Sequence, residues 1–300
     1  MMRAGRARGF PAARGPNVHR GRQQIRRGRT VQTTMRNSHC QFRSPRLIKI
    51  ASAVFFLLAG FVCTSLRCSA AADELFKQTY PLPPGGSFLL ENVNGSVHVD
   101  GWERDEVEVS AVKTAQSDQH DLDLVRIEVD SKPGQIAVHT RYPKGQGVEV
   151  AVEYHVHVPY RVLLGSVQTV NGSVMVRGIE GAGELRSVNG NVEVTDSTGR
   201  FSEKTTNGNV RLELRQLFDG GPMNLETVNG SVMLGLPSTA RTELKVLSMN
   251  GDVFSELPVT STAGSAGARA FQAKMGSGGG QISVRTVNGG IHLFLQRPGV

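Results

Sequence analysis

The segment Val170-Asn171-Gly172-Ser173-Val174-Met175-Val176 shows the unit from which this chain is built, an Asn-Gly pair followed by alternating apolar residues. The pair returns as Asn94-Gly95, Asn189-Gly190, Asn207-Gly208, Asn229-Gly230, Asn250-Gly251 and Asn288-Gly289. Neighbouring Asn residues of the series are 77, 18, 18, 22, 21 and 38 positions apart. A recurring step near 20 residues is typical of repeat architectures, so the period decides the fold class.

Apolar residues recur at fixed offsets from each Asn. Three positions later stand Val97, Val174, Val192, Val210, Val232, Val253 and Ile291. Five later the residue is apolar except Ser255, and four earlier it is apolar except Glu203. These offsets alternate as strand residues do, with one face inward, and β-branched side chains suit a pleated surface.

The Asn-Gly pair is compatible with two folds, since it provides backbone conformations of positive φ. One is a type I′ hairpin in an antiparallel meander, and the other is the corner of a β-solenoid with parallel coils. Two positions before the Asn, six copies carry Thr or Ser and the seventh carries Asn92, which suggests a hydrogen-bonded row of stacked side chains. Because stacked identical coils favour such repetition and a hairpin does not require it, we predict an all-β solenoid.

The chain begins with a basic leader. Residues 1–46 contain twelve Arg and no Asp, Glu or Lys, and we expect them to be disordered; Met35 is an alternative start. Residues 47–72 combine a flanking basic residue, the apolar run Ile50 to Val62 and the small residues Ser69 to Ala72. This layout predicts a signal peptide, with an uncleaved single-pass anchor as the alternative. Either places the rest of the chain outside the cytoplasm, in the periplasm, on the surface or secreted.

Removal of the leader reverses the charge of the protein. Residues 73–300 keep 20 Lys and Arg (34 minus the 14 of the leader) against 26 Asp and Glu, a net charge of −6. Nucleic-acid binding therefore loses its main support. All three Cys also lie in the leader, so residues 73–300 have no disulfide or thiol chemistry.

Residues 73–300 read as one solenoid domain. Within it we expect irregular first coils over 73–164, regular coils over 165–257, a flexible Gly/Ala/Ser-rich insertion over 258–280 and a last coil over 281–300.

Few residues suggest chemistry. His155, His157 and Glu153 share one face of a strand and are weak candidates for a metal site, because the spacing provides no further ligand. The acids of the repeats, which are Glu184, Glu193, Asp196, Glu203, Glu213 and Glu226, stand at different offsets and mostly point outward in this interpretation. A glycoside hydrolase needs paired carboxylates, so we predict no catalytic residues, no cofactor and no metal.

An ordered series of motifs resembles the domain family of unknown function DUF4097. It comprises Gly86 to Gly95, Gly101-Trp102, Val156-His157-Val158-Pro159 and then the repeated Asn-Gly corners, and it covers about Phe76 to Leu295. The family consists of exported bacterial proteins that are often labelled as adhesins. The resemblance implies a β-solenoid-like fold, an extracytoplasmic location and no established catalytic residues. Glu203 and the insertion depart from the pattern.

We expect a non-enzymatic envelope module, an adhesin or structural protein, whose partner is an envelope polymer, a glycan or another protein. A self-assembling envelope scaffold and a carbohydrate-active β-helix enzyme are the alternatives. Contact with a membrane is expected only through an uncleaved leader.

Overall fold

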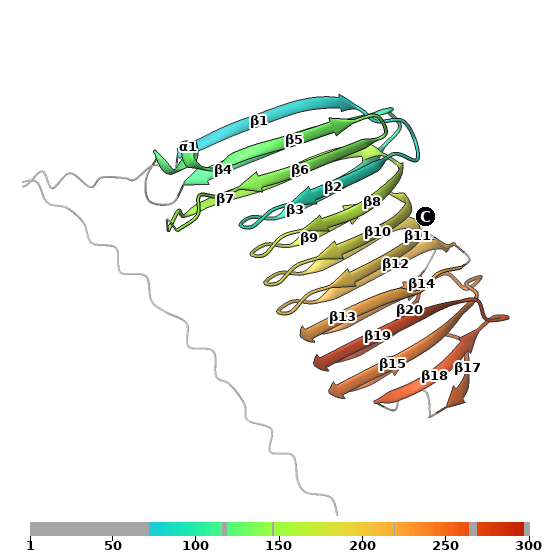
Figure 1. Ribbon diagram of the computed structural model, residues 1–300. Coiled ribbons are helices and arrows are strands. Elements are labelled where there is room, and N and C mark those ends of the chain that lie inside the picture. Colours follow the sequence, from blue (N-terminus) through green and yellow to red (C-terminus); the bar gives the residue numbers. More distant parts are fainter. Residues whose placement is uncertain (1–71, 116–118, 146, 219, 264–268, 297–300) are drawn as a thin grey trace, which may run out of the picture. The chain divides into compact units, whose positions relative to one another are not determined.

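The computed structural model describes residues 72–115, 119–145, 147–218, 220–263 and 269–296 (Figure 1). The elements in these residues are strands apart from one short helix. They are β1 (Ala72–Pro81), β2 (Ser87–Glu91), β3 (Val97–Trp102), β4 (Glu106–Ala115), α1 (Asp121–Leu124), β5 (Arg126–Lys132), β6 (Gln135–Arg141), β7 (Val150–Pro159), β8 (Arg161–Gln168), β9 (Val174–Arg177), β10 (Glu180–Arg186), β11 (Val192–Lys204), β12 (Val210–Leu217), β13 (Met223–Asn229), β14 (Val232–Leu236), β15 (Thr242–Asn250), β16 (Val253–Ser255), β17 (Val259–Ala263), β18 (Ala270–Met275), β19 (Gly280–Asn288) and β20 (Ile291–Leu295).

The seven Asn-Gly copies form seven coils of a solenoid. In each coil one strand precedes the Asn-Gly corner and another follows it, and the equivalent strands of successive coils pair in parallel. We call the strands before the corners ladder A and those after them ladder B. Ladder A runs β5-β6-β2-β8-β10-β11-β13-β19-β15-β18-β17, and ladder B runs β1-β4-β7-β3-β9-β11-β12-β14-β20-β16. The predicted all-β solenoid is confirmed.

The coils do not stack in the order of the sequence. The coil of Asn288 lies between those of Asn229 and Asn250, because β19 pairs with both β13 and β15, and β20 pairs with both β14 and β16. We expected residues 281–300 to form the last coil. Their strands β19 and β20 do form the coil that comes last in the sequence, but this coil lies inside the stack and not at its end. The antiparallel partner β18 occupies the outer side of β15, which leaves only the inner side of β15 free for β19.

Antiparallel strands extend both ends of the stack. Among the described residues of 73–164, one Asn-Gly coil is present, formed by β2 and β3. The strands β1, β4 and β7 pair antiparallel in ladder B, and β5 and β6 do so in ladder A. Residues 258–280, expected as a flexible insertion, contain β17 and β18, which add an antiparallel pair beyond β15. The region expected to form irregular first coils thus consists mostly of antiparallel strands. Its longer connections hide the repeat of about 20 residues in the sequence.

The core lies between the two ladders. Every residue three positions after a corner Asn is buried, from Val97 to Ile291, and so is every residue four positions before it. All of these residues are aliphatic except Glu203, and burying each aliphatic side chain stabilises the fold by about 1.5–3 kcal/mol.

The Gly residues of the corners are required by the close approach of neighbouring coils. A Cβ added to Gly208 would lie 2.1 Å from the carbonyl oxygen of Gly190, and one added to Gly190 would lie 2.0 Å from that of Gly172. The expected positive φ occurs at four corner glycines, Gly95, Gly172, Gly230 and Gly289, and clearly in the left-handed region only at Gly95, where φ is 114°. Asp196 is the only described non-glycine residue with positive φ, so no corner Asn adopts it. Contact between backbones, more than backbone conformation, selects Gly here.

The corner Asn side chains form a continuous ladder of hydrogen bonds. Asn189 Nδ2 donates to Asn171 Oδ1 at 2.8 Å, and Asn207 Nδ2 donates to Asn189 Oδ1 at 2.8 Å. The Thr and Ser hydroxyls two positions earlier do not bond to one another. Instead each donates to the carbonyl of the neighbouring coil's corner Gly, as Thr205 Oγ1 does to Gly190 O at 2.8 Å. Two hydrogen-bonded rows thus hold each corner to the next.

Candidate functional site

The outer face of ladder A carries three parallel rows of side chains, which we call the three-row face. The rows stand five, three and one position before each corner Asn, where strand alternation turns side chains to solvent. In stacking order the polar row is Leu89, Ser166, Glu184, Ser202, Asn224, Ser283 and Lys245; the charged row is Glu91, Gln168, Arg186, Lys204, Glu226, Arg285 and Leu247; the apolar row is Val93, Val170, Val188, Thr206, Val228, Val287 and Met249.

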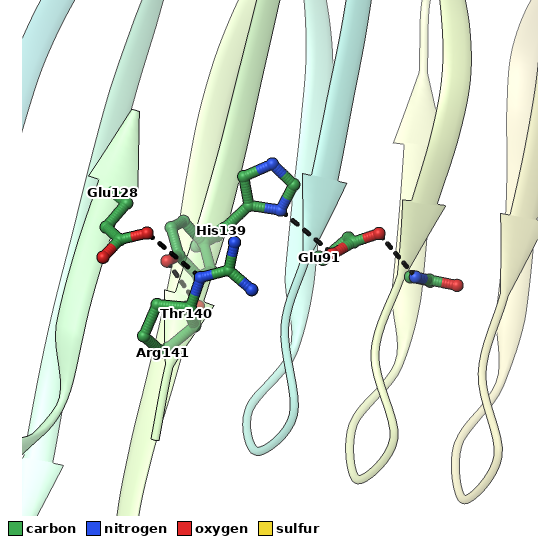
Figure 2. Close-up of polar contacts among 7 residues, drawn as sticks. Glu91, Glu128, His139, Thr140 and Arg141 are labelled. Carbon is green, nitrogen blue, oxygen red and sulfur yellow. Dashed lines mark hydrogen bonds and ion pairs between the residues drawn. The ribbon is translucent and has the colours of Figure 1, made fainter. Parts of the chain in front are cut away.

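The charged row begins in a polar network across β6, β2 and β8 (Figure 2). Glu91 Oε2 lies 3.0 Å from Nδ1 of His139, and Gln168 Nε2 donates to Glu91 Oε1 at 3.1 Å. On the neighbouring strand β5, Glu128 Oε2 accepts from Arg141 Nε at 3.0 Å. At this end of the face the polar groups satisfy one another.

A depression lies at the middle of the three-row face. Its outward lining residues are Glu184, Arg186, Ser202, Lys204, Asn224 and Glu226, from β10, β11 and β13. Both carboxylates are ion-paired, Glu184 with Arg186 at 3.2 Å and Glu226 with Lys204 at 3.1 Å. A general acid and base that flank a glycosidic bond need two carboxyl groups facing an open space, and these two are each engaged with a cation.

Two further depressions adjoin the first on the same face. One, towards β8, is lined by Leu163, Arg200 and Pro222, and it shares Glu184 and Ser202 with the central depression. The other, towards β15, is lined by Lys204, Glu226, Val228, Leu247, Met249, Arg285 and Val287. The three depressions lie side by side across the strands from β8 to β15, and we refer to them together as the groove.

The remaining repeat acids lie elsewhere. Glu193 and Glu213 are on ladder B, where both pair with Arg211, and Asp196 pairs with Arg215 at 3.2 Å. Their different offsets from the corner Asn predicted that the repeat acids would not share one site, and these three acids indeed lie away from the three-row face.

Glu203 corrects the expectation that the repeat acids point outward. Its side chain is only 1% exposed, and its register partners on either side are Leu185 and Leu225. Neither carboxylate oxygen has a hydrogen-bond partner among the described residues. Burial, and to a smaller extent the charge of Glu193, raise the pKa of Glu203 well above its usual value, which favours the neutral form of the group in the core. The alternation itself predicts this position as inward, because Glu203 occupies an apolar offset.

The candidate metal residues lie on the outer face of ladder B. The ring of His155 stacks on that of His98, with 4.7 Å between centroids, and His157 stacks on Trp102 at 5.1 Å. Burial, followed by the charge of His155, lowers the pKa of His98. Glu153 lies on the same face of β7, opposite Val112 of β4. In the described part of the chain, no group of three or more His, Cys, Asp or Glu has the arrangement of a metal site.

The predicted leader lies outside the described residues. This applies to the Arg-rich residues 1–46 and to residues 47–71 of the predicted signal peptide or anchor. Within the described residues, no helix has the length and apolar character needed to cross a membrane.

In comparisons with known proteins, residues 87–293 match the family model described as Toastrack DUF4097. A candidate cell adhesion protein from Clostridium sporogenes has a similar structure, with 10% identity, 74% of this chain and 100% of that chain covered, and a TM-score of 0.45. A candidate adhesin from Bacteroides fragilis matches with 11% identity, 73% and 96% coverage and a TM-score of 0.33. A candidate lipid-binding protein from Parabacteroides distasonis matches with 9% identity, 75% and 97% coverage and a TM-score of 0.23. No curated protein sequence matches.

Proposed function

This chain belongs to the Toastrack family DUF4097, and we propose that it is a non-enzymatic binding module of the bacterial cell envelope or surface. Its place of action in this proposal is outside the cytoplasm. The observation that carries the proposal is the three-row face, whose polar and apolar rows are each interrupted once and whose charged row is interrupted twice over the seven coils. A surface with such a regular spacing suits an extended or repetitive partner, as the long faces of solenoid proteins generally do.

The ion-paired carboxylates of the groove favour binding over hydrolysis. Glu184 pairs with Arg186 of the charged row, and Glu226 pairs with Lys204 of its own row on the next strand, so the groove resembles a charged contact surface more than an acid–base pair. The carbohydrate-active enzyme therefore has less support than the binding module.

Self-assembly through the ends of the stack also has less support. Among the described strands, the end of ladder B is β16, which has three residues, and the opposite edge strand β1 carries Asp73, Glu74 and Lys77. Short or charged edge strands oppose the addition of further strands.

The test is to express the full chain in a bacterial host, fractionate the cells and sequence the N-terminus of the product. We expect the protein in the periplasmic, surface or secreted fraction, with a start near Ala71 to Asp73 after cleavage or at the original start if the leader is retained as an anchor. The purified product should bind isolated cell-envelope material and should sediment as a discrete species. A product that stays in the cytosol and does not bind envelope material would contradict the proposed function.

A further inference from the structure

We propose that the groove on the three-row face binds an acidic polysaccharide whose chain runs along the stack, across the strands from β8 to β15. The inference rests on the proposed function and names the ligand class of that binding module.

The first argument is the local charge of the groove. Its lining includes four cations, Arg186, Arg200, Lys204 and Arg285. Its outward acids are Glu184 and Glu226, and the third acid of the lining, Glu203, is the buried carboxyl whose pKa is raised. This excess of positive charge stands on a domain that is acidic as a whole, since residues 73–300 have 20 basic against 26 acidic residues. A cationic groove on an acidic protein draws anionic chains to that groove and keeps them from the rest of the surface.

The second argument is that one cation of the groove has no partner of its own. Arg285 lies beside Glu226 in the register of β13 and β19, but Glu226 forms its ion pair with Lys204 on the other side. Among the described residues, no carboxylate lies within ion-pair distance of Arg285. Its guanidinium is therefore available for an external carboxylate or sulfate, which an arginine binds through two parallel hydrogen bonds.

The third argument is the spacing of the rows. Arg186 and Lys204 stand on neighbouring strands, and Arg285 follows beyond Glu226. Since strands lie about 4.8 Å apart, one charged side chain recurs with each strand here, on the scale of a sugar unit. Ser202, Asn224 and Ser283 offer hydrogen-bonding groups to sugar hydroxyls on one side of the charged row.

The apolar row borders the other side of the charged row. Val188, Val228 and Met249 are 41%, 39% and 57% exposed, and they can cover the C–H faces of a sugar chain. A polymer lying on the charged row would thus contact polar side chains along one flank and apolar side chains along the other.

The rows also distinguish the acidic polysaccharide from other ligands. None of the residues in the three rows is aromatic, so neither the bases of a nucleic acid nor the ring faces of a neutral glycan have an aromatic platform to stack on. Charge and hydrogen bonds must then provide most of the affinity, which favours an acidic chain.

The experiment measures binding of the purified full chain, in the mature form that the cells yield, by calorimetry at low and high salt. The probes are polygalacturonate, hyaluronate and heparin, with dextran as the neutral control and phosphatidylglycerol vesicles as the membrane control. We expect at least one acidic polysaccharide to bind, more weakly at high salt, and dextran not to bind. Arg285→Ala should weaken this binding about tenfold or more, because a charge-assisted contact is lost.

The matched control is Arg177→Ala, which removes an exposed arginine from the outer face of ladder B. Equal loss in both variants would overturn the assignment to the three-row face. Binding of dextran as tight as that of the acidic chains would overturn the charge argument while leaving the proposed function intact. Vesicle binding that depends on Arg285, without polysaccharide binding, would replace this ligand with a membrane. Binding to none of these probes by a protein that is exported and binds envelope material would overturn only this inference.

Discussion

The amide of Asn288 donates from Nδ2 to Oδ1 of Asn229 at 2.8 Å, although 59 positions separate the two residues. Asn250 in turn donates to Asn288 at 3.0 Å. The Asn ladder therefore runs through the coil of Asn288, which comes last in the sequence, and ends at the coil of Asn250, which comes before it in the sequence. The coil of β19 and β20 connects β15, β16, β17 and β18 to the rest of the solenoid.

Truncation tests this order of coils. A chain that ends after Gly279 lacks β19 and β20, so β13 and β15 lose their shared partner, and β15 to β18 lose their connection to the stack. We expect limited proteolysis to digest the chain beyond about Leu236 and to spare the coils before it. A chain that ends after Gln296 is the control. If the truncated chain kept protease protection over β15, the inserted position of the last coil would be wrong.

The close approach of the corners predicts a large effect of one added methyl group. Gly208→Ala places a Cβ against the carbonyl oxygen of Gly190, and neither backbone can move without separating two coils. We expect a loss of about 1–3 kcal/mol or more in the free energy of unfolding, measured with urea.

Gly147→Ala is the matched control for this substitution. A Cβ at Gly147 would meet no atom within 4 Å, and its φ is not in the left-handed region. We expect its free energy of unfolding to be within about 0.5 kcal/mol of the original value. Equal effects of the two substitutions would contradict the steric explanation of the Asn-Gly corner.

The Asn ladder predicts a dependence on position along the stack. Asn207→Leu removes two side-chain hydrogen bonds, one donated to Asn189 and one accepted from Asn229. Asn250→Leu removes only the bond donated to Asn288. At about 0.5–1.5 kcal/mol for each bond, the inner substitution should cost roughly twice as much as the outer one in urea unfolding. A larger cost at Asn250 would show that the ladder does not contribute bond by bond.

Glu203 predicts an unusual dependence of stability on pH. Its carboxyl is buried without a hydrogen-bond partner in the part of the chain that the structure describes, and its pKa is raised above the value of the unfolded chain. An acid whose pKa is raised on folding favours the folded state fully only below the unfolded pKa, and this contribution is lost as the pH rises through the folded pKa. We therefore expect Glu203→Leu, which matches Leu185 and Leu225, to stabilise the protein by about 1–3 kcal/mol at pH 7.

The pH profile separates this ionisation from simple packing. The advantage of Glu203→Leu in the free energy of unfolding should shrink as the pH is lowered towards the unfolded pKa of about 4.3. Glu184→Gln, at an exposed carboxylate, is the control and should show no comparable change. If the stability of Glu203→Leu ran parallel to that of the unaltered protein at every pH, the neutral buried carboxyl would be excluded.

The repeat explains how much of the molecule could be predicted. Alternation around Asn171 and its equivalents correctly identified the inward positions, because strand periodicity places every second side chain on one face. The same reasoning applied one residue further along each strand would have indicated the three-row face, since the offsets between two inward positions are outward. The acid at Glu203 was interpreted by its charge instead of by its offset, and the offset was correct.

The spacing of residues alone was sufficient to predict the parallel coils, the inward rows and the family. Each of these depends on intervals within one copy of the repeat or on the order of short motifs. The order of the coils depends on which copies lie side by side, and the corners of Asn229, Asn250 and Asn288 offer nearly identical edges to one another. The antiparallel pairing of β18 with β15 occupies one of these edges and leaves the other for β19. That choice involves strands about 30 to 60 residues apart in sequence, so only the tertiary structure decided it, and with it the row that places Arg285 beside Glu226.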